Sequence, residues 1–207
     1  MITRIEGDIL ASNVYVISNG RECFIVDAGV KLNVLKQYVR GQKVLGVFLT
    51  HGHYDHIYYL EDYLSEFGCK AYASEFAKEY ICDADKNLSK IFYNHEMEIK
   101  NLSKVNFLCA DGTIKIGDFE IEYFQLGGHS KGDMVFVFEK NLFVGDLILG
   151  DSIGRIDMYG GDKNAMIKSL DFLENYDYKI MYSGHGSENR KETQDNVVRL
   201  WKKFLDR

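Results

Sequence analysis

Three histidines and one aspartate lie within six residues of one another, directly after an apolar run that predicts a buried β-strand. The run is VLGVFL at residues 44–49, and the pattern H-x-H-x-D-H then supplies His51, His53, Asp55 and His56. A single histidine is usually an ordinary polar residue of a fold, but histidines this close together would repel one another when charged. Imidazole and carboxylate are common metal ligands, so the segment predicts a bound cation.

Three further candidate ligands follow predicted strands elsewhere in the chain. His129 comes after FEIEYFQL in the motif GGHS, Asp146 after LFV in GD, and His185 after KIMYS in GHG. Each stands beside glycine just past a strand, and such loops converge where strand ends share one edge of a sheet. The sequence therefore predicts one metal site built from four separate segments. His95 stands outside these motifs, and its polar surroundings predict an exposed residue.

The predicted elements follow the same order in the two halves of the chain. Apolar alternation or apolar runs predict strands at residues 2–6, 14–18, 22–27, 44–49, 113–116, 119–126, 134–138, 142–145 and 179–183. Helical spacing predicts helices at residues 32–39, 57–67, 163–176 and from 192 onward. Strand clusters followed by helices, twice over, predict a four-layer α/β sandwich of two sheets with helices outside. No repeat or linker-like stretch marks a boundary, so one domain is expected over residues 1–207.

Local signals predict how several of these elements begin and end. Asn19 and Gly20 favour a tight hairpin turn, because both residue types tolerate positive φ. Gly68 is typical of a helix C-terminus and Asp162 of a helix N-cap. The last helix is expected to bury an apolar face made of Val197, Val198, Trp201, Phe204 and Leu205.

Composition narrows the classes of partner. The formal net charge is −6 with acidic and basic residues interleaved, so no basic stripe predicts nucleic-acid binding. No apolar run approaches the ~20 residues of a membrane span and the start lacks an export signal, so a cytoplasmic protein with a small-molecule substrate is expected. Cys23, Cys69, Cys82 and Cys109 show no C-x-x-C spacing, which predicts buried reduced thiols outside the metal site. The oligomeric state is left open.

The order H-x-H-x-D-H, GGHS, GD and GHG resembles the metallo-β-lactamase superfamily over essentially the whole chain. A D-x-G element, Asp27 to Gly29 after CFIV, matches as well. The stretch SIGRIDMYGGD at residues 152–162 resembles glyoxalase II-like (hydroxyacylglutathione hydrolase-like) enzymes, whose C-terminal helical domain has no counterpart in this sequence. The resemblance implies the αββα sandwich of the metallo-β-lactamase fold.

The resemblance also implies a dinuclear site. It assigns His51, His53 and His129 to one metal, Asp55, His56 and His185 to the second, and Asp146 to a bridge between them. These ligand types suit Zn²⁺, so two zinc ions are expected, with iron or manganese as alternatives. Two cations lower the pKa of a water between them toward about 7, which creates a nucleophile for hydrolysis and makes Asp55 and Asp146 the catalytic residues. Asp27 and Thr50 are expected to orient ligands through hydrogen bonds, with loop capping as the alternative for Asp27.

Fold alone does not select a reaction, so the substrate is inferred from smaller features. His53 keeps the hydrolytic pattern, whereas the diiron flavoproteins that resemble this family carry glutamate there. The resemblance implies a thioesterase for an acylated small thiol such as a hydroxyacylglutathione-like compound, with lactone or other ester hydrolysis as the alternative. The candidate substrate contacts are Tyr54, Lys131, Arg155 and Tyr159. The alternatives are loop packing, an Arg155–Asp157 ion pair and a merely exposed Lys131.

Two further interpretations stay open. Persulfide dioxygenases share most of these motifs but use one iron, at positions matching His51, His129 and Asp146. The second interpretation is a protein that binds metal without catalysing a reaction. Metal analysis with oxygen uptake separates the first from a hydrolase, and a panel of esters and thioesters separates the second.

Overall fold

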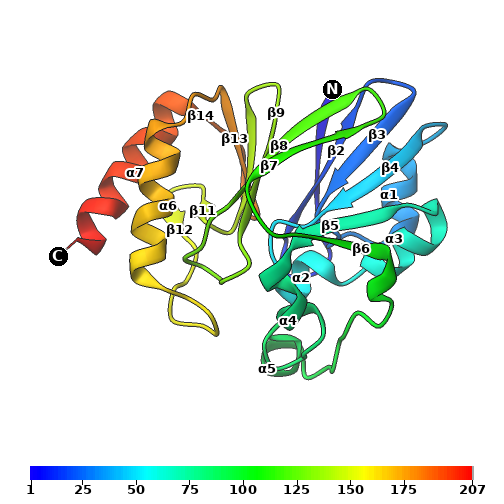
Figure 1. Cartoon of the computed structure of the whole chain (residues 1–207), viewed down its shortest axis with the longest axis horizontal. Coiled ribbons are helices and arrows are strands. Elements are labelled where there is room, and N and C mark those ends of the chain that lie inside the picture. Colours follow the sequence, from blue (N-terminus) through cyan, green and yellow to red (C-terminus); the bar gives the residue numbers. More distant parts are fainter. Residues whose placement is uncertain (207) are drawn as a thin grey trace.

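The computed structural model describes residues 1–206, which form two six-stranded β-sheets packed face to face with helices on both outer faces (Figure 1). This arrangement confirms the predicted four-layer αββα sandwich. The order of layers follows the chain, because the first sheet and its helices precede the second sheet and its helices.

The first sheet has the strand order β1-β2-β3-β4-β5-β6. Its strands are β1 (Ile2–Glu6), β2 (Asn13–Ser18), β3 (Glu22–Val26), β4 (Lys43–Phe48), β5 (Lys70–Ser74) and β6 (Val105–Leu108). β1, β2 and β3 pair antiparallel, and β3 to β6 pair parallel. The carboxyl ends of the parallel strands therefore share one edge, and the H-x-H-x-D-H segment leaves the sheet there, after β4.

The second sheet has the strand order β14-β13-β10-β9-β8-β7. Its strands are β7 (Gly112–Ile116), β8 (Phe119–Gln125), β9 (Met134–Phe138), β10 (Asn141–Gly145), β13 (Ile180–Ser183) and β14 (Asn189–Arg190). The pairing is antiparallel except between β10 and β13. A separate two-stranded sheet consists of β11 (Ile148–Leu149) and β12 (Ser152–Ile153).

The longer helices cover the two outer faces. α1 (Leu32–Tyr38) and α3 (Leu60–Phe67) lie on the first sheet, and α6 (Lys163–Asn175) and α7 (Lys191–Leu205) lie on the second (Figure 1). The short helices in the connections are α2 (Tyr54–Ile57), η1 (Glu75–Ala77), α4 (Lys78–Ile81), α5 (Ser89–Tyr93) and η2 (Leu102–Lys104).

The core consists of three apolar layers, because alternate residues of a strand point to opposite faces. In β3, Cys23 and Ile25 pack toward the helices of the first sheet, whereas Phe24 and Val26 pack between the two sheets. Phe24 meets Phe119 of the second sheet edge to face, with ring centroids 5.1 Å apart. Strands buried on both faces explain why the sequence shows continuous apolar runs here.

Several local predictions are confirmed. Gly68 ends α3 with a φ of +61°, and Asp162 caps α6 by accepting a hydrogen bond from the Ala165 N–H at 2.7 Å. Gly20 has a φ of +94° in the turn between β2 and β3. Asn19 closes this turn, because its side-chain oxygen accepts from the backbone N–H groups two and three residues later.

Two local predictions are wrong. The helix expected over residues 57–67 is split into α2 and α3, because the Tyr59 N–H bonds to the Ala28 carbonyl in the loop after β3 instead of continuing a helix. Phe204 is 61% exposed rather than part of the core. It lies about 120° around α7 from the fully buried Val198, and its ring contacts that of Trp201 with centroids 5.5 Å apart.

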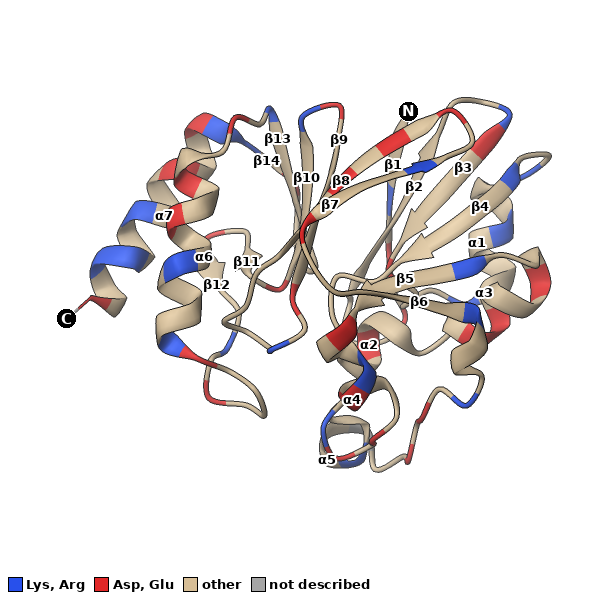
Figure 2. Ribbon diagram, viewed as in Figure 1, with Lys and Arg blue, Asp and Glu red and all other residues tan. Residues whose placement is uncertain are grey.

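Lysine, arginine and the acidic residues are interspersed over the molecule, and both signs occur along α6 and α7 (Figure 2). Ion pairs from Glu174 of α6 to Arg199 and Lys202 of α7 join these helices at 2.9 and 3.1 Å. Across residues 1–206, none of the helices combines the length and apolar character that crossing a membrane requires.

Candidate metal centre

The candidate ligands lie in four loops that follow four strands. The H-x-H-x-D-H segment follows β4 of the first sheet, and His129, Asp146 and His185 follow β8, β10 and β13 of the second. All of these side chains are buried except His185, which is 24% exposed. The structure therefore brings together every residue that the sequence analysis assigned to the metal site.

Asp55 and Asp146 lie between the histidine rings. The Nε2 atom of His185 is 3.2 Å from Asp55 Oδ2 and 3.5 Å from Asp146 Oδ2. The Nε2 atom of His56 is 3.3 Å from Asp55 Oδ2 and 3.4 Å from Asp146 Oδ1. His129 Nε2 approaches Asp146 Oδ2 from another side at 3.7 Å. Asp146 is thus the carboxylate that faces histidines from three different loops.

Three sets of ligand atoms lie within 4.8 Å of one another and are close enough to hold an ion. The sets are His51, His53 and His129; His51, His56 and Asp146; and Asp55, His56 and His185. Ligand atoms arranged tetrahedrally at about 2.0–2.1 Å from a metal are about 3.3 Å apart, which is close to the nitrogen–oxygen distances around the two carboxylates. Within residues 1–206, the buried Nε2 of His51 makes no hydrogen bond, as expected of an atom whose partner is an ion. These residues fit a divalent cation.

Asp27 and Thr50 orient two of the ligand rings. His56 Nδ1 donates a hydrogen bond to Asp27 Oδ2 over 2.8 Å, because a carboxylate only accepts. Thr50 donates to the same carboxylate from its backbone N–H at 2.8 Å and its hydroxyl at 2.7 Å. The Thr50 hydroxyl oxygen also lies 3.2 Å from His51 Nδ1. Both rings therefore present Nε2 to the site, which is the usual role of such hydrogen bonds beside a metal.

Asp133, which the sequence analysis missed, holds the loop that carries His129. Its carboxylate accepts hydrogen bonds from the backbone N–H groups of His129 and Ser130 at 2.9 Å and from the Ser130 hydroxyl at 2.5 Å. The ring of His129 in turn donates from Nδ1 to the carbonyl of Arg155 at 2.8 Å. An aspartate beside a glycine is typical of a turn, but the sequence does not tell which backbone N–H groups its carboxylate accepts hydrogen bonds from.

Burial and nearby charge divide the imidazoles into two kinds. Burial lowers the pKa of His51 well below its usual value, and burial together with His129 lowers the pKa of His53 to about 3. Burial opposes protonation of His185 as well, but its hydrogen bonds to Asp146 and Asp55 raise its pKa to about 9. His51 and His53 are therefore neutral and offer lone pairs, whereas His185 must release a proton to bind a cation.

Gly184 lies against the Asp146 carboxylate, where a side chain does not fit. A Cβ at this position would lie 2.0 Å from Asp146 Oδ1 and 2.9 Å from His56 Cε1. We expect Gly184→Ala to displace the carboxylate and to lower metal affinity at least about 10-fold. Gly127→Ala is the matched control, because a Cβ there meets only ordinary contacts at 3.6 Å. Equal metal affinities of the two variants in a competition titration with a chelator would contradict this prediction.

The candidate ligands border a cleft of about 230 Å³. Tyr54 and Arg155, two of the four predicted substrate contacts, line it. Arg155 also pairs with Asp157 through two hydrogen bonds of 2.9 Å, so the predicted ion pair exists as well. The cleft is completed by apolar side chains for which the sequence holds no chemical signal, namely Leu10, Leu88, Phe92 and Met158.

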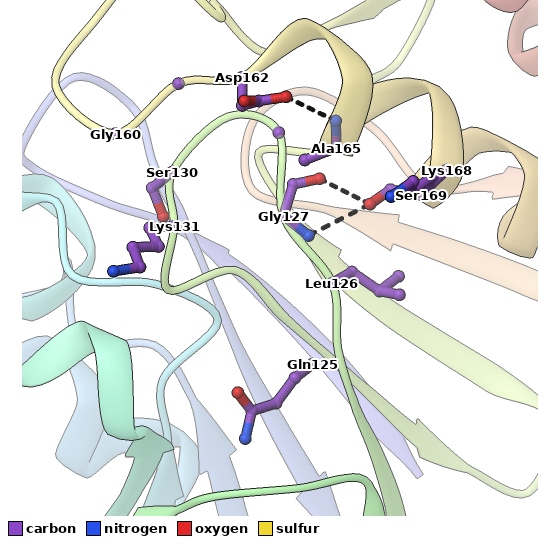
Figure 3. Close-up of a pocket in the computed structure, with 12 residues that line it drawn as sticks. Gln125, Leu126, Gly127, Ser130, Lys131, Gly160, Asp162, Ala165, Lys168 and Ser169 are labelled. Atoms are coloured by element: carbon purple, nitrogen blue, oxygen red, sulfur yellow. Dashed lines mark hydrogen bonds between the residues drawn. The ribbon is translucent and has the colours of Figure 1, made fainter.

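Lys131 and Tyr159 do not line this cleft. Lys131 lies over the Phe76 ring at 4.8 Å and borders a larger cavity of about 580 Å³ between the loop after β8 and α6 (Figure 3). The Tyr159 hydroxyl contacts Glu79 at 3.4 Å. Of the described residues, those lining the larger cavity include none of the candidate ligands, so the smaller cleft is the candidate active site.

The cysteines take no part in the metal-binding sets found among residues 1–206. Cys23 and Cys69 are buried as expected, whereas Cys82 is half-buried and Cys109 is exposed, which corrects the prediction for these two residues. Burial raises the pKa of Cys23 to about 12 and that of Cys69 to about 11. We expect iodoacetamide at about pH 8 to modify Cys109 and to leave the two buried thiols and the bound metal unchanged. Peptide mass mapping with metal analysis tests this, and metal loss on alkylation would contradict it.

His95 is exposed, as the sequence analysis expected. Its ring lies near that of Tyr58, with centroids 6.3 Å apart, and it belongs to none of the three metal-binding sets found in the described part of the chain.

Comparisons with known proteins identify the family of this chain. The family model described as "Metallo-beta-lactamase superfamily" matches residues 7–185. The Bacillus subtilis (strain 168) protein described as "Probable metallo-hydrolase YqgX" is 28% identical over 193 residues, which cover 90% of each chain. The crystal structure of BLEG-1 B3 metallo-beta-lactamase has a TM-score of 0.87 at 25% identity and covers 95% of this chain and 97% of its own. The crystal structure of TTHA1623 in a di-iron-bound form has a TM-score of 0.78 at 23% identity. The match covers 94% of this chain and 98% of TTHA1623. With its αββα fold and its cluster of histidines and aspartates, this chain belongs to the metallo-β-lactamase superfamily.

Proposed function

We propose that this chain hydrolyses thioesters of small acyl groups with two divalent metal ions, of which zinc is the first to test. The observation that carries the proposal is the position of Asp146, whose two carboxylate oxygens face histidines of both candidate metal sites. The Bacillus subtilis relative, described as a probable metallo-hydrolase, supports hydrolysis as the reaction class. Thioesters are preferred because residues 152–162 resemble the glyoxalase II-like enzymes.

We infer the ligand division from the sets of atoms that lie close together. One ion would lie among His51, His53 and His129, the other among Asp55, His56 and His185, and Asp146 would contact both. When bound, such ions lower the pKa of a coordinated water and polarise a carbonyl oxygen. Neutral imidazoles on one side and paired carboxylates on the other supply the ligand types that zinc prefers.

The chain itself would orient the substrate and handle the proton. Hydrolysis breaks the C–S bond, adds the OH of water to the acyl carbon and leaves its hydrogen on the sulfur. Asp55 lines the cleft, and beside the Oδ2 that faces His185 it has a second oxygen that can orient the water and accept its proton. Arg155 lines the same cleft, and its guanidinium, which donates two hydrogen bonds to Asp157, has further N–H donors for an acidic group of the thiol carrier.

The proposal is tested by metal analysis of the protein purified from its own host, followed by turnover of a thioester panel with the metal found. We expect two metal ions per chain and anaerobic release of free thiol. Iron is the second metal to test, because TTHA1623 was solved in a di-iron-bound form. One iron per chain with oxygen uptake on a persulfide would replace the proposal with the redox alternative. Bound metal without turnover of any thioester, lactone or other ester would indicate a non-catalytic protein.

A further inference from the structure

Four apolar side chains form part of the lining of the candidate metal cleft, namely Leu10, Leu88, Phe92 and Met158. Leu10 and Phe92 are 60% and 51% exposed although they are large apolar residues, and Met158 lies beside them in the lining. They come from segments far apart in the chain, and all of them line this cleft. Among the described residues of the lining, Arg155 is the one lysine or arginine. The cleft thus combines an apolar wall, made of these four side chains, with one guanidinium, which Asp157 already pairs.

The turn that carries Leu10 is a strained one. The Ser12 N–H bonds to the Ile9 carbonyl at 3.0 Å, and the two residues between them, Leu10 and Ala11, have φ values of +50° and +56°. Positive φ at both central positions is the pattern of a type I′ turn, in which glycine, asparagine and aspartate dominate because a Cβ is strained there. Leucine therefore occupies a position at which glycine, asparagine or aspartate would be less strained. Strain of this kind is typical of ligand-binding segments.

A second leucine of the wall is held in the same way. Leu88 has a φ of +71° and is 5% exposed. The residue before it, Asn87, fixes this conformation by donating from its side-chain amide to the Met97 carbonyl at 2.7 Å and by accepting from the Ser89 N–H at 2.9 Å. Two separate loops therefore place a leucine in the left-handed conformation beside the metal ligands.

Both loops are bonded to the backbone of the H-x-H-x-D-H segment. The Ser12 hydroxyl donates to the Asp55 carbonyl at 2.7 Å, and the Asn87 carbonyl accepts from the Tyr54 N–H at 2.9 Å. The apolar wall is thereby fixed relative to the metal ligands. A fixed wall beside the reacting atoms can discriminate between substrates, because its contacts do not have to be ordered on binding.

We propose that the apolar wall made by Leu10, Leu88, Phe92 and Met158 selects thioesters whose acyl group is an unsubstituted chain of about four to six carbons, with Arg155 facing an anionic thiol carrier. The proposal rests on the proposed function. The cleft of about 230 Å³ is small, which favours a short acyl chain. A hydroxyl placed against these four side chains would lose water without gaining a hydrogen-bond partner from them, so a chain without a hydroxyl at that position is favoured.

The first experiment measures binding of the carboxylate products, from acetate to octanoate, to the zinc-loaded protein by calorimetry. We expect the dissociation constant to fall about fourfold for each added methylene up to about six carbons and then to level off. Leu10→Asn should flatten this dependence and keep the fold, because asparagine suits a left-handed turn. Phe92→Ser tests the other exposed part of the wall. Leu200→Asn is the matched control, because Leu200 is a 65% exposed leucine of α7.

The second experiment compares kcat/KM for acetyl, lactoyl, butyryl and hexanoyl thioesters of one thiol. The wild type should favour hexanoyl over acetyl by at least about 10-fold, and Leu10→Asn should lose most of this preference while Leu200→Asn keeps it. Binding that does not change with chain length would contradict acyl-chain selection by the apolar wall. Leu10 and Phe92 variants that bind like the wild type would contradict it as well. Chain-length-dependent binding without thioester turnover would instead contradict the proposed reaction, while binding of the acyl chain by the apolar wall would still hold.

Discussion

Asp146→Ala is expected to lose metal and hydrolytic activity together, with activity falling by more than about 100-fold. The side chain faces His56, His129 and His185 from 3.4 to 3.7 Å, so its removal takes a ligand from both candidate metal positions at once. Loss of an outer hydrogen-bond partner of a metal site costs about 10–100-fold, and loss of a shared ligand should exceed that range.

The measurement is metal content by mass spectrometry beside kcat/KM on the best thioester, with circular dichroism to show that the variant is folded. Asp151→Ala is the matched control, because Asp151 is an exposed aspartate five residues further on. Asp146→Asn, which keeps one carbonyl oxygen, should retain more metal than Asp146→Ala. An Asp146→Ala protein with two metal ions and normal turnover would contradict the shared-ligand assignment.

Asp27→Asn is expected to lower metal affinity about 10–100-fold and to destabilise the fold by about 1–3 kcal/mol. The buried carboxylate accepts three hydrogen bonds, two from Thr50 and one from His56 Nδ1, and an amide can replace only one of its oxygens as an acceptor. Asparagine is the informative substitution because Asp27 has a φ of +63°, which asparagine tolerates better than alanine does.

Chelator competition gives the metal affinity of this variant and urea denaturation gives its free energy of unfolding. Asp118→Asn is the matched control, because the Asp118 side chain is 67% exposed and pairs only with the exposed Arg21 in the described part of the chain. If Asp27→Asn binds metal as the wild type does, the carboxylate orients no ligand, and its role is confined to closing the loop around Thr50.

The agreement between the sequence predictions and the structure is greatest where a residue type has one local structural or chemical role. The imidazoles of His51, His53 and His56 follow a buried strand at fixed spacing, and a backbone leaving a sheet edge keeps such neighbours together whatever the rest of the chain does. Gly68 and Asp162 were equally predictable, because left-handed φ and N-capping are local demands. Phe204 was not, because helical spacing identifies an apolar stripe without fixing how much of it the neighbouring sheet covers.

Arg155 and Lys131 show the limit of the same reasoning, since both are basic residues in loops near metal ligands. Arg155 lines the metal cleft and Lys131 lies over Phe76 beside a different cavity. Which face of a loop a long side chain occupies depends on backbone turns and on neighbours from other segments, such as the Asp133 hydrogen bonds that shape the loop around His129. The apolar wall could not be predicted for a related reason. Leu10 and Phe92 are apolar like core residues, and only the folded structure places them at the cleft.

The sequence by itself determined the layered αββα architecture, the motif order of the family and the candidate metal-site residues, because hydrophobic periodicity and ligand chemistry are local properties of the chain. Only the tertiary structure decided the distances at which Asp146 faces the histidines, that Asp133 holds the loop of His129 and that Leu10 and Leu88 adopt left-handed conformations at the cleft. These are relations between segments, and their distances are set by packing of the whole fold rather than by neighbouring residues.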